Sequence, residues 1–248
     1  MKTHFFSTLA IVAFVGLFAS CSSSGKSGKT DWDEYELKGR VKQLTIELYD
    51  PNSTLSRNGE PVLRSAKTIH FNPEGQTEFV ELFGLYMQRA GYCSYTYTKK
   101  DNKLYKRKDY HNWYSVQEFI YDDNRIVQEN GYTGEKLDVI EKYEYDEKGN
   151  LVKVMCYRPD GRLSSFNEYT YDEHGRVTRE VVRSSSGSIQ LDRSITYTDK
   201  GFVQFEGEGP YRTEYMHEQF DNVGNYTLRN INDKGRGIIM EKRTIIYY

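Results

Sequence analysis

Apolar and polar residues alternate with a period of two along the middle of this 248-residue chain. Because successive side chains of a β-strand point to opposite faces, the alternation predicts an antiparallel sheet with one buried face. The even positions are mostly polar. The odd positions are expected to share the buried face, and they are Tyr143, Tyr145, Leu151, Met155, Tyr157, Leu163, Tyr169, Tyr171, Val177, Val181, Ile189, Leu191, Ile195, Tyr197, Val203 and Phe205.

A repeated turn divides this stretch into hairpins. The segment Tyr145–Leu151 recurs as Tyr171–Val177 and again as Tyr197–Val203, with successive tyrosines 26 residues apart. An aspartate or threonine followed three residues later by glycine favours a tight loop of three residues, in which the glycine takes positive φ. The first and last residues of each segment should therefore pair across a hairpin. Further turns of the same length are expected halfway between these, at 158–162 and 184–188.

The repeat extends over most of the chain at spacings of 23 to 27 residues. Its anchor aromatic positions are Phe71, Tyr97, Tyr121, Tyr145, Tyr171, Tyr197, Phe220 and Tyr247, and its clearest turn glycines are Gly149, Gly175, Gly201 and Gly224. Roughly 14 to 17 strands cannot remain one flat sheet, because open sheets beyond ~10 strands curl, split or close. We therefore expect an all-β antiparallel meander of repeated hairpins over 32–248, curled or folded into one elongated repeat domain, and the pattern leaves open whether the sheet closes.

Residues 1–21 precede this domain and have the pattern of an export signal. Lys2 is followed by an apolar run, and the run ends in small residues before Cys21. The segment resembles a bacterial lipoprotein signal, which would make Cys21 the lipid-attachment residue and anchor the chain to a membrane. An ordinary secretory signal cut nearby is the alternative. Residues 22–31 are small and polar and are expected to form a flexible tether, and a capping strand is expected within 32–50.

Charge and cysteine content exclude some classes of protein. The formal net charge is −2, which does not favour a nucleic-acid partner. Three cysteines leave only Cys93 and Cys156 after the lipid site, so the chain has no disulfide framework. The two are expected to be small, partly buried apolar residues, and a bridge between them is the alternative.

No motif for catalysis, metal binding or cofactor binding is evident. The five histidines have no spacing typical of metal ligands, and neither cysteine has a local partner that would make it a nucleophile. The aspartates that open the turns are already explained by turn chemistry. We therefore expect no enzyme activity, no cofactor and no metal.

The 22 tyrosines and 12 phenylalanines are the remaining chemical signal. They could form a stacking platform for a sugar or a protein, or they could pack against one another across strands. Residues that interrupt the repeat are better candidates for specific binding. They are Tyr110, His111, Trp113 and Tyr114, and also Tyr211 and Tyr215 close to the Gly207–Pro210 break.

The segments Tyr145–Leu151 and Tyr171–Val177 resemble the YD repeat of the RHS family, and the chain resembles short YD-repeat lipoproteins of Gram-negative bacteria. The resemblance implies a β-hairpin scaffold. Large RHS proteins wind such repeats into a shell around a toxin domain, and this chain has too few copies to imply that role.

Together these features predict a lipid-anchored protein of the cell envelope, an outer-membrane lipoprotein facing either the periplasm or the cell surface. Its expected role is a non-catalytic binding or interaction module for an unknown protein or glycan. One alternative is a structural envelope component that assembles with protein partners. The other is a surface protein that binds, or hydrolyses, carbohydrate.

Overall fold

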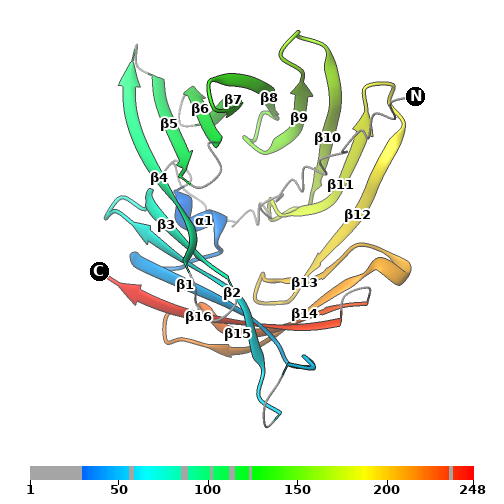
Figure 1. Ribbon diagram of the computed structural model, residues 1–248. Coiled ribbons are helices and arrows are strands. Elements are labelled where there is room, and N and C mark those ends of the chain that lie inside the picture. Colours follow the sequence, from blue (N-terminus) through cyan, green and yellow to red (C-terminus); the bar gives the residue numbers. More distant parts are fainter. Residues whose placement is uncertain are drawn as a thin grey trace, which may run out of the picture.

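The computed structural model describes residues 30–55, 59–84, 89–100, 103–111, 115–122, 125–234 and 237–248. Within them, strands that follow one another in sequence pair antiparallel, and β1 (Val41–Asp50) also pairs with β16 (Gly237–Tyr247). The result is a closed barrel of sixteen strands (Figure 1). The other strands are β2 (Val62–Phe71), β3 (Thr77–Phe83), β4 (Arg89–Lys100), β5 (Lys103–Tyr110), β6 (Ser115–Asp122), β7 (Arg125–Thr133), β8 (Lys136–Tyr145), β9 (Leu151–Tyr157), β10 (Leu163–Tyr171), β11 (Val177–Ser184), β12 (Ile189–Tyr197), β13 (Val203–Glu206), β14 (Thr213–Phe220) and β15 (Tyr226–Asp233).

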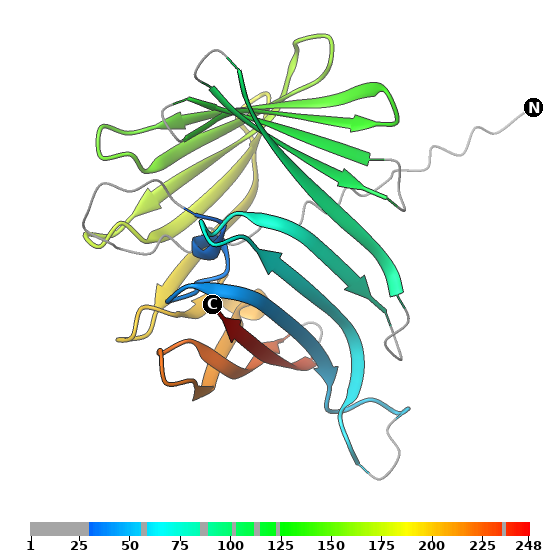
Figure 2. The ribbon, with the colours of Figure 1, turned by 90° about the vertical axis from the view of Figure 1, so that its left-hand side faces the viewer.

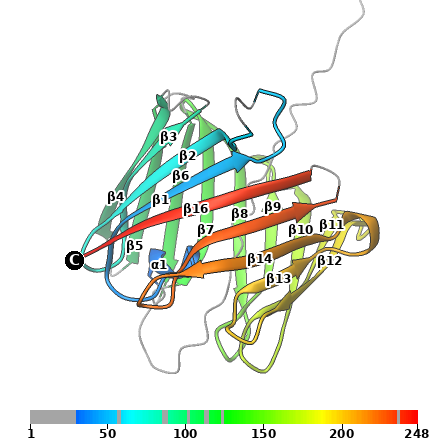
Figure 3. The same ribbon diagram turned by 90° about the horizontal axis from the view of Figure 1, so that it is seen from below.

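The sequence repeat explains the number of strands. Each of the eight anchor aromatic residues lies in the last part of an even-numbered strand, from Phe71 in β2 to Tyr247 in β16. One repeat is therefore one pair of strands. The all-β antiparallel prediction is confirmed, but a closed barrel replaces the elongated domain that was expected. Closure pairs the first strand with the last, as Figure 3 shows for β1 and β16, and it removes both sheet edges.

The predicted turns are confirmed. In the first of them, the amide of Asp146 donates to the carbonyl of Asn150 at 2.9 Å, and that of Gly149 donates to the carbonyl of Asp146 at 2.9 Å. Gly149 has a φ of 87°, in the left-handed region that glycine adopts without strain. Tyr145 pairs with Leu151 as expected, and the turns at 172–176, 198–202, 158–162 and 184–188 repeat the geometry.

The prediction that all odd positions share one face is wrong, because most hairpins contain a β-bulge. Tyr145 pairs with Leu151 but Glu144 pairs with Lys153, so one extra residue on β9 shifts the alternation. Beyond the bulge, Val154 lies opposite Tyr143 on the inner face. Several of the listed residues, including Met155, Tyr157, Val181 and Phe205, pair with residues of the outer face instead.

Successive turns lie at opposite ends of the barrel because neighbouring strands run antiparallel. The turns at 72–76, 146–150, 172–176, 198–202 and 221–225 share one end, which we call the YD rim. The turns at 158–162, 184–188 and 207–212 share the other, the opposite rim.

A single-turn helix, α1 (Asp31–Glu34), lies inside the ring of strands (Figures 1 and 2). Trp32 donates from its indole Nε1 to the carbonyl of Val41 at 2.8 Å. Its ring covers Gly75 so closely that a Cβ there would lie 2.7 Å from a ring carbon. Residues 30 and 31, assigned to the tether by the sequence, therefore belong to the fold, and residues 32–40 precede the first strand.

The densest packing forms around α1. Leu37, Leu44, Ile69 and Phe71 are buried there, with Trp32 packed against them. A second, smaller cluster lies across the barrel and contains Val177, Ile195, Val203 and Tyr215.

The outer face of the wall is rich in charge. Exposed or half-exposed ion pairs cross it, including Arg64–Asp50, Arg107–Glu118, Arg179–Asp192 and Arg183–Glu168. No helix in the described part of the chain has the length and apolar character needed to cross a membrane.

Candidate functional site

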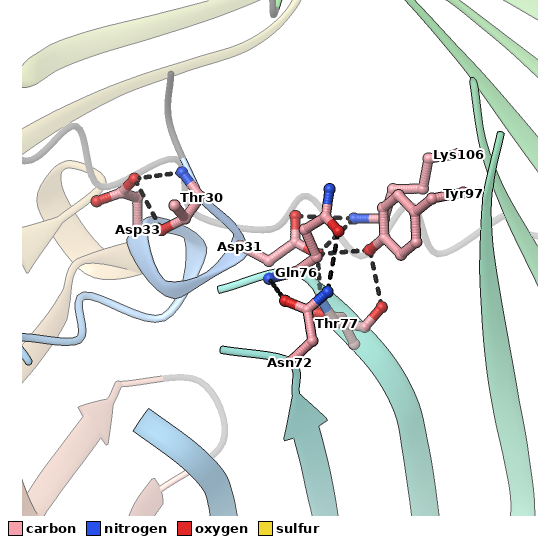
Figure 4. A network of polar contacts seen from close by, with 8 residues as sticks. All are labelled: Thr30, Asp31, Asp33, Asn72, Gln76, Thr77, Tyr97 and Lys106. Carbon is pink, nitrogen blue, oxygen red and sulfur yellow. Dashed lines mark hydrogen bonds and ion pairs between the residues drawn. The ribbon is translucent and has the colours of Figure 1, made fainter. Parts of the chain in front are cut away.

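Asp31 fixes α1 to the inner face of the barrel (Figure 4). Its carboxylate lies 2.9 Å from the ammonium of Lys106 on β5 and accepts hydrogen bonds from the backbone amide of Thr77 at 2.7 Å and the hydroxyl of Tyr97 at 3.0 Å. The Lys106 side chain is only 6% exposed and that of Asp31 13%. Burial alone would raise the pKa of Asp31, but the Lys106 charge and the hydrogen bonds outweigh it and hold the pKa below its usual range.

Solvent reaches the inside of the barrel. The side chain of Glu34 is exposed although α1 lies within the ring of strands (Figure 1). Inward-facing tyrosines on the walls, such as Tyr121, Tyr143 and Tyr169, also keep part of their surface accessible. The interior is therefore not filled by the chain's own side chains, and we call this solvent-accessible interior the lumen.

The anchor tyrosines form a hydrogen-bonded row along the YD rim. The hydroxyl of Tyr171 donates to the carbonyl of Leu151 at 2.6 Å, and that of Tyr197 donates to the carbonyl of Val177 at 2.8 Å. Tyr145 makes the equivalent bond to the carbonyl of Ile126. The Tyr97 hydroxyl lies 2.7 Å from the carbonyl of Thr77 and donates its single proton either there or to Asp31. Each bond ties one repeat to the preceding one, so these hydroxyls have a structural role.

Deeper in the barrel, buried carboxylates are neutralised by arginine. Arg193 on β12 bridges Glu180 of β11 and Glu206 of β13. Across the barrel, Glu241 on β16 accepts from Arg229 at 2.7 Å and from Arg243 at 2.8 Å. The two arginines hold the pKa of Glu241 at about 2, against the effect of its burial.

Glu129 on β7 and Glu141 on β8 differ from these carboxylates, because their hydrogen-bond partners are uncharged. The hydroxyl of Tyr143 lies 3.0 Å from a carboxylate oxygen of Glu129 and 3.1 Å from one of Glu141. The amide of Gln117 donates to Glu129 at 2.7 Å, and Gln117 accepts from Tyr110. Among the described residues, no arginine or lysine forms an ion pair with either glutamate.

The pKa values of the pair reflect burial and mutual repulsion, which outweigh the positive charge of Lys108. Burial, followed by the negative charge of Glu141, raises the pKa of Glu129 to about 7. Burial also raises the pKa of Glu141. Near neutral pH Glu129 is therefore partly protonated, and the Tyr143 hydroxyl can accept from its protonated carboxyl while donating to Glu141. We call Glu129, Glu141, Tyr143 and Gln117 the acidic cluster.

The predicted binding residues do not form one site. Tyr110 faces the lumen and donates to Gln117 of the acidic cluster at 3.1 Å. His111 lies on the outer face, where its ring stacks on Tyr92 at 4.2 Å and hydrogen bonds to Ser94. Trp113 and Tyr114 lie outside the described residues.

The second predicted group also separates. Tyr211 is 84% exposed at the opposite rim, whereas Tyr215 is 9% exposed and donates to Glu206 at 2.8 Å. Its ring therefore packs in the wall, apart from the exposed Tyr211, and a role of Tyr215 in binding stays a prediction.

Sequence reasoning missed Glu129 and Glu141 themselves. The available signal was a polar residue that recurs four positions before the anchor aromatic residue, as Gln117, Glu141, Asn167 and Arg193 do. Turn chemistry drew attention to the exposed aspartates instead.

Cys93 and Cys156 are both free thiols, so the alternative of a bridge is wrong. Cys21 lies outside the described residues. Within the described residues, no group of three or more histidine, cysteine, aspartate or glutamate side chains could hold a metal ion.

Comparison with known proteins agrees with the repeat. Residues 145–188 match the sequence model of the RHS repeat. The chain therefore carries an RHS repeat, as the YD segments indicated. No curated protein sequence matches the chain.

The barrel is similar to a solved structure, a porin-like protein from Bacteroides uniformis. The two share 10% sequence identity over 83% of this chain and 98% of the other, with a TM-score of 0.59. At this identity the likeness concerns the fold.

Proposed function

We propose that the protein is a lipid-anchored barrel of the cell envelope that binds a glycan in its lumen without converting it. The observation that carries the proposal is the acidic cluster: two carboxylates that form no ion pair with a described arginine or lysine lie among half-exposed tyrosine rings inside the barrel. Carboxylates accept hydrogen bonds from sugar hydroxyls, and tyrosine offers an apolar face for the ring.

The envelope location is supported by three features. The N-terminal segment ends at Cys21 in the pattern of a lipoprotein signal, residues 145–188 match the RHS repeat, and the fold is similar to that of a porin-like protein. Charged residues such as Arg107 and Arg179 project from the outer face of the wall, where a lipid-facing barrel would have an apolar band. A lipid at Cys21 would instead hold the barrel beside the membrane.

The test is a titration of the full chain with chitooligosaccharides and peptidoglycan fragments, followed by tryptophan fluorescence, to which Trp32 on α1 contributes, and by calorimetry. We expect saturable binding that Glu129→Gln and Glu141→Gln weaken at least tenfold. Glu144→Gln is the matched control, because Glu144 is on the same strand as Glu141 but points outward. Binding that both lumenal variants retain, or no binding across the panel, contradicts the proposal.

The anchor is tested separately. Cys21→Ser is expected to move the protein from the membrane fraction to the soluble fraction of the envelope. An unchanged distribution contradicts the lipid attachment.

Glycan hydrolysis is the second candidate function, and one distance favours it. Both carboxylates contact the same hydroxyl, at 3.0 and 3.1 Å, so their nearest oxygens lie no more than about 6 Å apart. This upper limit includes the ~5–5.5 Å of retaining glycosidases. The same titration decides between the two: release of reducing ends, abolished by Glu129→Gln, would replace the binding role.

A further inference from the structure

The repeat breaks after β13, and a pocket forms at the break. β13 is four residues long and pairs with β14 only through Phe205 and Glu206. A short 3₁₀ turn, η2 (Gly209–Tyr211), follows it at the opposite rim. Beside this turn, on the outer face of the wall, lies a pocket of about 380 Å³ lined by Ser194, Thr196, Phe205, Gly207, Glu208, Gly209 and Arg212.

The backbone builds the pocket. The amide of Gly207 donates to the carbonyl of Ser194 at 2.8 Å, which fixes the start of the turn against β12. Gly207 has a φ of 85°, and a Cβ there would lie 2.9 Å from the carbonyl oxygen of Tyr211. Only glycine allows the chain to fold back this tightly, so the shape of the pocket depends on this position.

Arg212 provides the pocket's cationic group. Its guanidinium carbon lies 3.5 Å from the centre of the Phe205 ring, so the fork of donors is held flat against the wall. Other outer-face arginines, Arg107, Arg179 and Arg183, are paired with carboxylates. For Arg212 no such pair occurs among the described residues, and the nearby Glu208 instead accepts from the Ser194 hydroxyl at 2.8 Å.

We propose that this pocket binds a carboxylate group of a small ligand, with Arg212 as the donor of two parallel hydrogen bonds and Thr196 as an additional hydroxyl. The guanidinium fork matches the geometry of a carboxylate and is held in place by its stacking on Phe205. The volume accommodates one sugar or one amino-acid residue. The carboxylate would come from an acidic sugar or from a peptide C-terminus.

The experiment follows the backbone amides of Gly207 and Gly209 in the full chain by NMR. Glucuronate and N-acetylalanine are the two carboxylate probes, and glucose and N-acetylalanine amide are their uncharged counterparts. We expect saturable shifts with one or both carboxylates, at least tenfold weaker binding of the uncharged compounds, and at least tenfold weaker binding to Arg212→Gln. The probe that binds more tightly identifies the source of the carboxylate.

Two further variants separate recognition from folding. Arg212→Lys keeps the charge but not the fork and should bind with intermediate affinity, while Arg158→Gln, at another turn of the same rim, should bind as the parent does. Equal binding of the charged and uncharged probes, undiminished binding to Arg212→Gln, or no saturable shift at either glycine overturns the proposal.

Discussion

The hydroxyl of Tyr171 donates to the carbonyl of Leu151 at 2.6 Å, across the boundary between two sequence repeats. Tyr197 and Val177 repeat the contact one unit later. This bond explains why the position is tyrosine: phenylalanine would fill the same space but leave the carbonyl without its side-chain donor. The most regular residue of the repeat therefore holds neighbouring hairpins together.

Replacing Tyr171 by phenylalanine is expected to lower the free energy of unfolding by about 1 kcal/mol, the net value of one hydrogen bond. Chemical denaturation measures the change. Tyr211→Phe is the control, because Tyr211 is 84% exposed, and it should have no effect. Equal stability of Tyr171→Phe and the parent would show that the bond adds nothing beyond ring packing.

Asp31→Asn should destabilise the protein by roughly 3 kcal/mol, because it leaves the buried ammonium of Lys106 without a counter-ion. The double variant Asp31→Asn with Lys106→Met should recover much of the loss. Since the folded-state pKa of Asp31 is depressed, the ion pair contributes its full stability above the ordinary aspartate pKa and loses it as the pH falls through the lower, folded-state value. Denaturation of parent and variants between pH 7 and pH 2 tests this, and a pH-independent difference would contradict it.

Arg193 on β12 and Arg179 on β11 allow a matched comparison between an ion-paired arginine inside the barrel and one on its outer face. Arg193→Met leaves Glu180 and Glu206 buried without a counter-charge and should cost about 3–5 kcal/mol at neutral pH. Arg179→Met removes an exposed pair with Asp192 and should cost far less, because water and salt screen that pair. Thermal denaturation of the two variants measures their losses of stability. Similar losses would show that the ion pairs of Arg193 are not desolvated.

Glu129→Gln is expected to stabilise the protein above neutral pH. A carboxyl whose pKa is about 7 in the folded state binds its proton more tightly than in the unfolded state. Stability should therefore fall as the pH rises from the ordinary glutamate pKa to about 7 and then level off, by roughly 3 kcal/mol in total. The glutamine variant should lose most of this slope.

The measurement is the free energy of unfolding at several pH values between 4 and 9. Glu144→Gln, on the outward side of β8, is the control and should retain the slope of the parent. If the unfolding free energy of Glu129→Gln depends on pH as that of the parent does, the raised pKa does not belong to Glu129.

Much of the fold could be predicted from the sequence because it is set by local chemistry. The polar first residue and the glycine of each YD turn specify a three-residue loop whose hydrogen bonds form within five residues, and Tyr145 pairs with Leu151 as that loop requires. The spacing of the anchor aromatics likewise gave the hairpin repeat. The inner and outer faces could be predicted only in part, because a bulge after Tyr145 moves Val154 inward and Met155 outward.

The candidate site was harder to predict, since its members come from separate strands. Gln117, Glu129 and Tyr143 lie on β6, β7 and β8, and only the register of those strands brings them together. The aromatic residues that interrupt the pattern were a poorer guide. His111 faces outward and Tyr215 is buried in the wall.

The sequence by itself determined that the chain forms antiparallel hairpins with an RHS-type repeat, because a turn and its two flanking strands depend on neighbouring residues. Closure was decided only in the tertiary structure: eight strand pairs accumulate enough twist and curl for β1 to meet β16, and no local pattern encodes that contact. The tertiary structure also placed α1 inside the ring and left Glu129 and Glu141 without an arginine. Contacts between residues far apart in the sequence fix the position of α1, and they also decide which buried charges have a counter-charge.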